Sequence, residues 1–346
     1  MASFLADQFP AFIVGMITGL ITGLLAGLLT PMALGTVRSF RARLVDALRP
    51  TVGWRAAEYE QLGVVAINEW SPARPLTADN LDLEVVSAPI QDWCDATQLQ
   101  ALRDACWDEG GRSATMVDYD IDHRESLYGQ TFRMRVAHSY YADFLALRAY
   151  ADSHPEFRPA LRERFSTGSP TDTLKSSAPS IIAINVSLVS GSKRVLAIKR
   201  SRAVATYQGF WSLGPAETLS TASPVPGDEE DLFTLGYRCL HEEVGLRAEK
   251  VRRLIISWIG FDLNWLLTLV LGQAVCDLST DDIDNCIGTA HSSFEAECWE
   301  WLPLNRATLS EIRDRYAYDR RGRVWIPSAA VAADKLWRMH RALTML

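Results

Sequence analysis

The stretch that most constrains the fold is residues 227–246, where an acidic segment leads into a helix that ends in adjacent carboxylates and a glycine. Its apolar residues recur at i, i+4, i+7 and i+11 and so share one continuous face: Phe233, Tyr237, Leu240 and Val244. Gly245 is placed to end the helix, because glycine adopts the left-handed conformation without strain. A helix with such a face needs a sheet or another helix to bury it.

Beside this face the sequence places a group of reactive side chains. Cys239, Glu242 and Glu243 stand at i, i+3 and i+4, which predicts that they share one edge of the helix, off the apolar face. Arg238 precedes Glu242 by one turn and can orient it, and Glu230 lies two turns earlier on the side of Arg238. Adjacent carboxylates on a rigid helix suit a hard divalent cation such as Mg2+, which can bind a diphosphate and activate water against phosphorus.

The spacing of these residues resembles a known family motif. Glu230, then seven residues, then RCLHEEVGL at 238–246 resembles the Nudix box, G-x5-E-x7-R-E-U-x-E-E-x-G-U, in which U is aliphatic. The order of elements around it is similar to the Nudix fold over about residues 178–305. The resemblance implies an α/β/α sandwich with a mixed sheet, and a hydrolase that acts on a nucleoside diphosphate derivative with Mg2+ or Mn2+.

The resemblance also implies a role for each matching residue. It assigns metal ligation to Glu242 and Glu243, structural support to Glu230, Arg238 and Gly245, and an additional ligand or the catalytic base to Glu295 or Glu297. Taken singly, these residues have simpler interpretations, since a glutamate and an arginine on a helix often form a solvent-side pair. It is the fixed spacing of the whole set that favours a nucleotide site.

Two positions depart from the motif. Cys239 stands where the family has a glutamate that usually binds metal, which removes a hard oxygen ligand. Pro224 stands where the family has a glycine, and the turn that begins at Gly214 matches that glycine better, with residues 218–228 as an insertion. The backbone after Gly214 would then face the phosphates of the substrate, and Glu217 could supply a compensating carboxylate to the metal.

Alternation of apolar residues predicts the rest of the architecture. Strands are expected at 181–189, 194–199, 211–213, 254–260, 263–276 and 299–302, and helices from about 308 and over 328–343. This order predicts a mixed sheet between helices. In the preceding small α+β region, strands are expected at 81–86 and 131–136 and helices at 97–107 and 140–150.

An acidic cluster in that region has the look of a cation loop. Asp118, Asp120 and Asp122 alternate with other residues beside His123. The cluster lacks the glycine and the distal glutamate of a calcium loop. The sequence therefore favours a solvated loop.

The N-terminus carries a second strong signal. Between Asp7 and Arg38 the chain has no charged residue, and residues 12–34 are apolar or small throughout, enough to span a bilayer core. Four arginines follow the apolar stretch: Arg38, Arg41, Arg43 and Arg49. The positive-inside tendency then predicts a single-pass membrane protein with its N-terminus outside and the Nudix-like domain in the cytoplasm.

Glycines recur along this predicted membrane helix at every fourth residue. Gly15, Gly19, Gly23 and Gly27 would line one shallow groove and let a second backbone approach closely. This pattern predicts homo-oligomers through the helix within the lipid bilayer. Glycine is also frequent in membrane helices in general, which is the simpler interpretation.

Composition excludes some classes of partner. The formal net charge is -7, and no segment carries a lysine or arginine stripe, which argues against a nucleic acid duplex as a partner. The six cysteines are scattered with no C-x-x-C spacing, as expected of reduced thiols.

The chain is therefore expected to contain a membrane helix with a short N-terminus at 1–37, a juxtamembrane helix and the α+β region at 38–165, a linker or loop at 166–179 and the Nudix-like domain at 180–346. The first functional hypothesis is a membrane-anchored hydrolase. The second is a nucleotide sensor that controls the membrane helix, a domain order that resembles transmembrane Nudix effectors of bacterial antiphage defence. A third is a Nudix-like interaction module. The loops expected to select the ligand are 203–207, 218–228 and 277–294.

Overall fold

The computed structural model describes residues 61–71, 74–86, 112–126, 129–167, 181–204, 206–220, 230–315 and 319–344, and the single positions 59, 101, 104, 173 and 317. All of them belong to one compact unit, Gly53–Leu346. The expected membrane helix with its glycines, the juxtamembrane helix and most of the linker lie outside the described residues. Within the described ranges, no helix is long and apolar enough to cross a membrane.

The larger sheet is mixed, as the sequence predicts. Its strands are β1 (Val64–Glu69), β5 (Ile182–Val189), β6 (Arg194–Arg200), β7 (Trp211–Ser212), β8 (Ala216–Thr218), β9 (Val251–Asp262), β10 (Leu267–Cys276) and β11 (Ala296–Pro303). Their order is β1-β9-β10-β5-β6-β11, with β7 paired to β6 and β8 paired to β5. Strands β5 and β10 run parallel and the other neighbours antiparallel.

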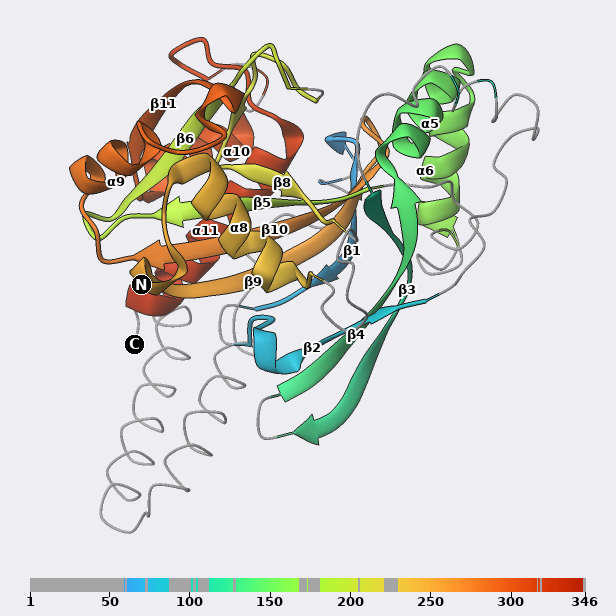
Figure 1. The fold of residues 1–346 in the computed structure, drawn as a ribbon, viewed down its shortest axis with the longest axis horizontal. Helices are drawn as coiled ribbons and strands as arrows, with labels where there is room; N and C mark the ends of the chain where they lie inside the picture. The colour runs from blue at the N-terminus through green and yellow to red at the C-terminus, as the bar shows by residue number, and fades with distance from the viewer. Residues whose placement is uncertain are drawn as a thin grey trace, which may run out of the picture. The chain divides into compact units, whose positions relative to one another are not determined.

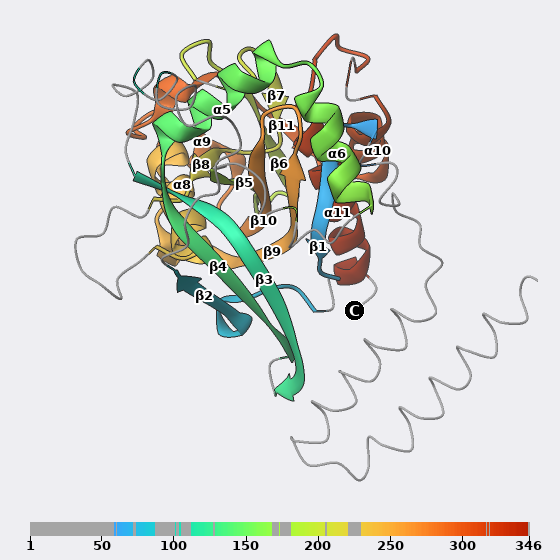
Figure 2. The same cartoon turned by 90° about the vertical axis from the view of Figure 1, so that its right-hand side faces the viewer.

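Helix α8 (Leu232–Val244) packs on one face of this sheet and α11 (Pro327–Thr344) on the other. Helix α9 (Thr280–Ile287) contacts α8, and α10 (Arg306–Asp314) contacts α11. Two further helices, α5 (Tyr141–Ser153) and α6 (Phe157–Thr167), precede β5, and short 3-10 turns lie at Ala78–Asn80, Ala248–Lys250 and Ser293–Glu295. Helix α8 crosses in front of β5, β10 and β9 (Figure 1), and a view from the side separates it from α11 across the sheet (Figure 2).

The central strands explain why two helical layers are needed. In β5, Ile184 and Val186 belong to the apolar cluster that includes the buried side of α8. In β10, Leu269 and Leu271 belong to the opposite cluster, which includes the buried side of α11. Strands buried on both faces read as nearly continuous apolar runs, and this is the pattern of both β5 and β10.

The region before residue 165 is joined to the main sheet. Strand β1 pairs with β9 and forms one edge of that sheet. A separate three-stranded sheet has the order β2-β4-β3, from β2 (Leu81–Val85), β4 (Gly129–Tyr140) and β3 (Arg112–Ser126). Buried side chains of this sheet join the cluster of α8, so both sheets share one core.

Two expectations about local structure are wrong. The acidic cluster at Asp118 and Asp120 is part of the long strand β3 and not a loop, since β3 pairs with β4 and Asp118 forms an ion pair of 2.7 Å with Arg135. The strand expected from residue 263 begins at Leu267, because the carboxylate of Asp262 accepts the backbone N–H groups of the next residues and makes a turn.

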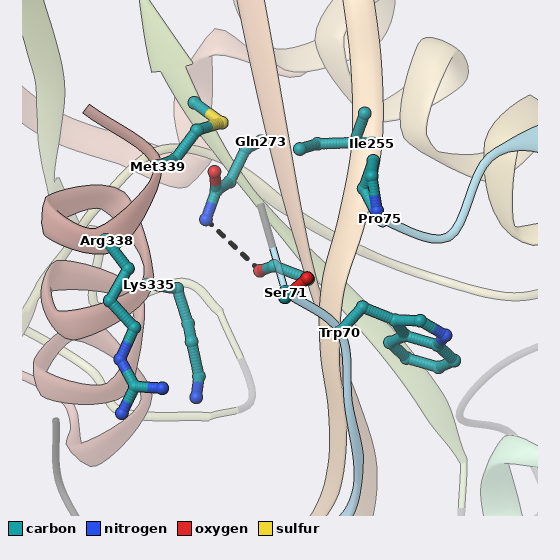
Figure 3. Close-up of a pocket in the computed structure, with 9 residues that line it drawn as sticks. Trp70, Ser71, Pro75, Ile255, Gln273, Lys335, Arg338 and Met339 are labelled. Carbon is teal, nitrogen blue, oxygen red and sulfur yellow. Dashed lines mark hydrogen bonds between the residues drawn. The ribbon is translucent and has the colours of Figure 1, made fainter. Parts of the chain in front are cut away.

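A buried polar network lies where α11 packs on the sheet. The Lys335 ammonium lies 2.6 Å from the Glu69 carboxylate and donates to the Tyr59 hydroxyl at 2.8 Å. Lys335 also lines a cavity of about 10 Å3, together with Gln273, whose Nε2 donates to Ser257 Oγ (Figure 3). Burial lowers the pKa of Lys335 to about 8 and outweighs the attraction of Glu69.

This lowered pKa predicts a pH-dependent stability. Between about pH 8 and 10.5 the unfolded chain holds the lysine proton and the folded chain does not, so stability rises with pH in this window. Relative to Lys335→Met, which cannot titrate, the free energy of unfolding of the unsubstituted chain should rise by roughly 2–3 kcal/mol across the window. Urea denaturation of both chains at several pH values measures this rise. The prediction is wrong if the free energies of unfolding of the unsubstituted chain and Lys335→Met change with pH in parallel.

Candidate functional site

Helix α8 holds the site residues in a fixed position. Its N-cap Asp231 accepts the backbone N–H groups of Phe233 and Thr234, at 2.9 and 2.6 Å. At the other end Gly245 has φ 72° and donates its N–H to the His241 carbonyl. Both ends follow from the sequence, since aspartate is a strong N-cap and glycine a common C-cap.

Arg238 is the centre of an ion-pair group. Its Nε and Nη2 donate to the two oxygens of Glu230, at 2.7 and 2.9 Å, and Nη2 also donates to the Thr218 carbonyl. Its Nη1 lies 3.4 Å from Glu217 and 3.5 Å from Glu242. The hydrogen bonds to Glu230 raise the pKa of Arg238, with the other carboxylates adding to the effect.

Glu243 differs from Glu242 in its surroundings. The side chain of Glu242 is 34% exposed, whereas Glu243 is 8% exposed and its Oε1 accepts the backbone N–H of Ala216 at 3.2 Å. The Sγ atom of the buried Cys239 lies 3.9 Å from the same oxygen. The sequence predicts that Cys239, Glu242 and Glu243 share an edge of the helix off its apolar face. This is wrong for Cys239 and Glu243, which are among the buried residues of α8.

The carboxyl of Glu243 is difficult to ionise. Burial raises its pKa well above the usual value, and the negative charges of Glu295 and Glu217 raise it further. Arg200 opposes this shift, as does the bond from the Ala216 N–H. The same burial raises the pKa of the Cys239 thiol, which stays neutral.

Gly214 positions the backbone that meets Glu243. It has φ 95°, and an added Cβ would lie 1.9 Å from the Val186 carbonyl oxygen, so a larger residue does not fit. Its own carbonyl accepts from Asn185 Nδ2 at 3.1 Å and from Ser212 Oγ at 2.8 Å. This turn leads into β8, which carries Ala216 and Glu217 to the end of α8.

A cavity of about 320 Å3 opens beside these residues. Its lining combines acidic, basic, hydroxyl, aromatic and apolar side chains: Glu217, Glu295, Arg200, Thr206, Thr218, Tyr141, Phe294, Ile181, Ala183, Ala203, Val204, Ala216 and Leu267. The volume lies near the lower end of the range for small-molecule sites, roughly 300–1,000 Å3.

Of the two later glutamates in the sequence, one lies at this cavity. Glu295 lines it, and burial together with the charges of Glu217 and Glu242 raises its pKa. Glu297 forms an exposed ion pair with Lys199 at 2.6 Å, and it is not among the cavity residues. The structure therefore places Glu295, and not Glu297, with the residues of the motif.

The carboxylates of the site repel one another in part. The charges of Glu295 and Glu217 act on Glu243, those of Glu217 and Glu242 act on Glu295, and a divalent cation would relieve this repulsion. In the observed conformation, no group of three or more His, Cys, Asp or Glu side chains within the described ranges has the spacing to hold a metal ion. Arg238 holds two of these carboxylates through its longer contacts. The chemistry of the donors suits Mg2+, and binding would require those contacts to open.

Some residues of the site have no signal in the sequence. Arg200 ends β6 and donates its Nε to the Thr206 carbonyl at 3.1 Å, which ties it to the loop expected to select the ligand. Tyr141 comes from α5, in the region before residue 165. Only the fold brings these two residues to one cavity. Phe294 falls within residues 277–294, which the sequence predicts to be a ligand-selecting loop, although α9 occupies Thr280–Ile287 of that range.

Comparison with family models finds no match, and neither does comparison with curated proteins. Among solved structures, the chain is similar to DR0079 from Deinococcus radiodurans, with 11% identity, a TM-score of 0.33 and coverage of 45% of this chain and 83% of that one. It is also similar to the MutT protein from Methanosarcina mazei Go1, with 18% identity, a TM-score of 0.31 and coverage of 48% and 96%.

A MutT/Nudix family protein from Listeria innocua is similar too, with 15% identity, a TM-score of 0.30 and coverage of 49% of this chain and 97% of that one. In this chain, the site brings Glu217, Glu242, Glu243 and Glu295 together with Arg200, Arg238 and the buried thiol of Cys239 at the C-terminal part of α8.

Proposed function

We propose that this chain is a Nudix-type hydrolase that cleaves the pyrophosphate linkage of a nucleoside diphosphate derivative with Mg2+ or Mn2+. One observation carries the proposal. The motif residues Glu230, Arg238, Glu242 and Glu243 lie together, with Glu217 brought to them by an element outside the motif. Such a cluster at the side of a cavity is suited to a cation and a diphosphate.

The residues have separable roles in this proposal. Glu242, Glu243 and Glu217 would hold the metal, which supplies charge neutralisation at the phosphate oxygens and a more acidic water. Glu295, whose pKa is raised, can accept the proton of the attacking water. The water oxygen forms a bond to one phosphorus as the bridging oxygen leaves with the other phosphate. Arg200 lines the cavity and can pair with phosphate oxygens.

A panel of nucleoside diphosphate derivatives tests the proposal. With Mg2+ or Mn2+ present, at least one member should be converted to phosphate monoesters. Conversion that persists at the same rate after the metal is chelated would contradict the role of the metal.

Replacing Cys239 by glutamate restores the residue of the motif and gives a further prediction. Without metal, a carboxylate at this fully buried position next to Glu243 should lower the melting temperature. Mg2+ should then raise the melting temperature of Cys239→Glu more than that of the unsubstituted chain, because a cation offsets the added charge. Cys239→Gln is the matched control, and an equal response to Mg2+ in both variants would count against a metal at this place.

A second candidate function is a nucleotide sensor. The observation that favours it is the buried neutral thiol of Cys239 at a position where the family has a metal ligand. A sensor would bind a nucleotide and form no product.

The proposed membrane anchor at residues 12–34 would make either activity a membrane-associated one, and fractionation of cells that express the full chain tests the anchor.

A further inference from the structure

Phe294 is placed unusually for a large apolar side chain. It is 64% exposed, more than Tyr140 at 44% and Trp299 at 37%, the other large hydrophobic side chains that are exposed within the described ranges. Of these three, Phe294 lines the cavity of the candidate site and the other two do not. An exposed aromatic at a cavity wall offers a flat surface to a ligand.

The backbone around Phe294 fixes it relative to the carboxylates. The Ser292 N–H donates to the Glu242 carbonyl at 2.8 Å, and the Ser201 N–H donates to the Glu295 carbonyl at 2.8 Å. The turn Ser293–Glu295 is thus held both to the end of α8 and to the start of the loop after β6. These main-chain hydrogen bonds therefore set the position of the backbone of Phe294 and Glu295 relative to α8.

The other walls of the cavity show what kind of group fits there. Ile181, Ala183 and Leu267 give an apolar surface, and Tyr141 adds a second aromatic side chain. The carboxylates and Arg200 provide the polar part. One cavity therefore offers apolar and aromatic walls for a planar ring as well as charged groups for a diphosphate, both within a volume of about 320 Å3.

We propose that Phe294 is the surface on which the base of the nucleotide stacks, and that it is a determinant of substrate binding. The inference rests on the proposed function in one respect, since the diphosphate must occupy the acidic part of the cavity. Stacking is available to every base, because each has a π face, and it contributes roughly 1–3 kcal/mol per base when an aromatic side chain is replaced by alanine.

The test is calorimetry on the full chain with ligands that cannot be hydrolysed. The α,β-methylene analogues of ADP, GDP, UDP and CDP are the nucleotide probes, and methylenediphosphonate is the probe without a base, all with Mg2+. Phe294→Ala should weaken binding of the preferred nucleotide analogue roughly 5- to 150-fold. Binding of methylenediphosphonate should not change, and Phe294→Trp should retain nucleotide affinity.

Trp299→Ala is the matched control, since Trp299 is an exposed aromatic outside the cavity whose Nε1 donates to Asp284. Three results would overturn the inference: unchanged nucleotide affinity in Phe294→Ala, an equal loss for methylenediphosphonate, or no binding of any nucleotide analogue by the unsubstituted chain. Hydrolysis is a separate outcome, because a chain that binds the analogues through Phe294 and turns over no nucleotide refutes the hydrolase and leaves the stacking role intact.

Discussion

Glu243→Gln is expected to lower kcat for the preferred nucleotide by at least about 100-fold. The proposal places Glu243 among the metal ligands, and the glutamine amide cannot supply the negative charge that a divalent cation requires. The fold should be retained, because the amide oxygen can still accept the Ala216 N–H that the carboxylate accepts in the structure. Steady-state kinetics with saturating Mg2+ and a melting curve of the same sample measure both effects.

The raised pKa values of Glu243 and Glu295 add a pH dependence to this prediction. Both carboxyls bind protons more tightly than usual, so activity should rise with pH through a range above the ordinary value of 4.5. Glu249→Gln, on the exposed turn after α8, is the control and should leave kcat unchanged. A Glu243→Gln variant with the rate of the unsubstituted chain would remove Glu243 from the mechanism.

Arg238→Met is expected to lower the free energy of unfolding by about 2–4 kcal/mol. The substitution keeps the aliphatic volume and removes the cation shared by Glu230, Glu217 and Glu242. The loss of the cation should destabilise Glu230 more than Glu217 or Glu242, because the Glu230 side chain is only 13% exposed and both of its oxygens accept hydrogen bonds from Arg238. Removing one partner of a mostly buried pair leaves a charge without compensation.

Urea denaturation at neutral pH measures this loss. Arg133→Met removes an exposed ion pair with Asp82 and should cost less than about 1 kcal/mol. Lowering the pH should reduce the difference in the free energy of unfolding between Arg238→Met and the unsubstituted chain, since protonated carboxyls are neutral and are not stabilised by the cation. A gap below that of Arg133→Met would mean that the ion-pair group contributes little to the fold.

The fold could be predicted where local pattern and burial agree. Helix α8, its glycine end and the mixed sheet follow from periodicity, because one apolar face and central strands buried on both sides leave a distinctive pattern. The edge strand β1 could not be assigned to the main sheet, since its pairing with β9 joins segments almost 200 residues apart in the chain. Such pairing has no local signal.

The site shows the same division. The motif spacing singles out Glu230, Arg238 and Glu242, which the structure brings together. The spacing misplaces Glu243, because a carboxylate close to the apolar face of a helix is buried only when a partner such as the Ala216 N–H is brought to it. Arg200 comes from a strand that the motif does not include, and only the sheet order brings it to the cavity.

Phosphorus NMR of the full chain with a panel of nucleoside diphosphate derivatives distinguishes a hydrolase from a protein that only binds nucleotides. With Mg2+ or Mn2+ present, we expect the diphosphate signals of at least one substrate to be replaced by those of phosphate monoesters, whereas Glu243→Gln should leave the diphosphate signals in place. Unchanged spectra for every member of the panel with both metals would contradict the claim that this acidic cluster is the centre of a hydrolase.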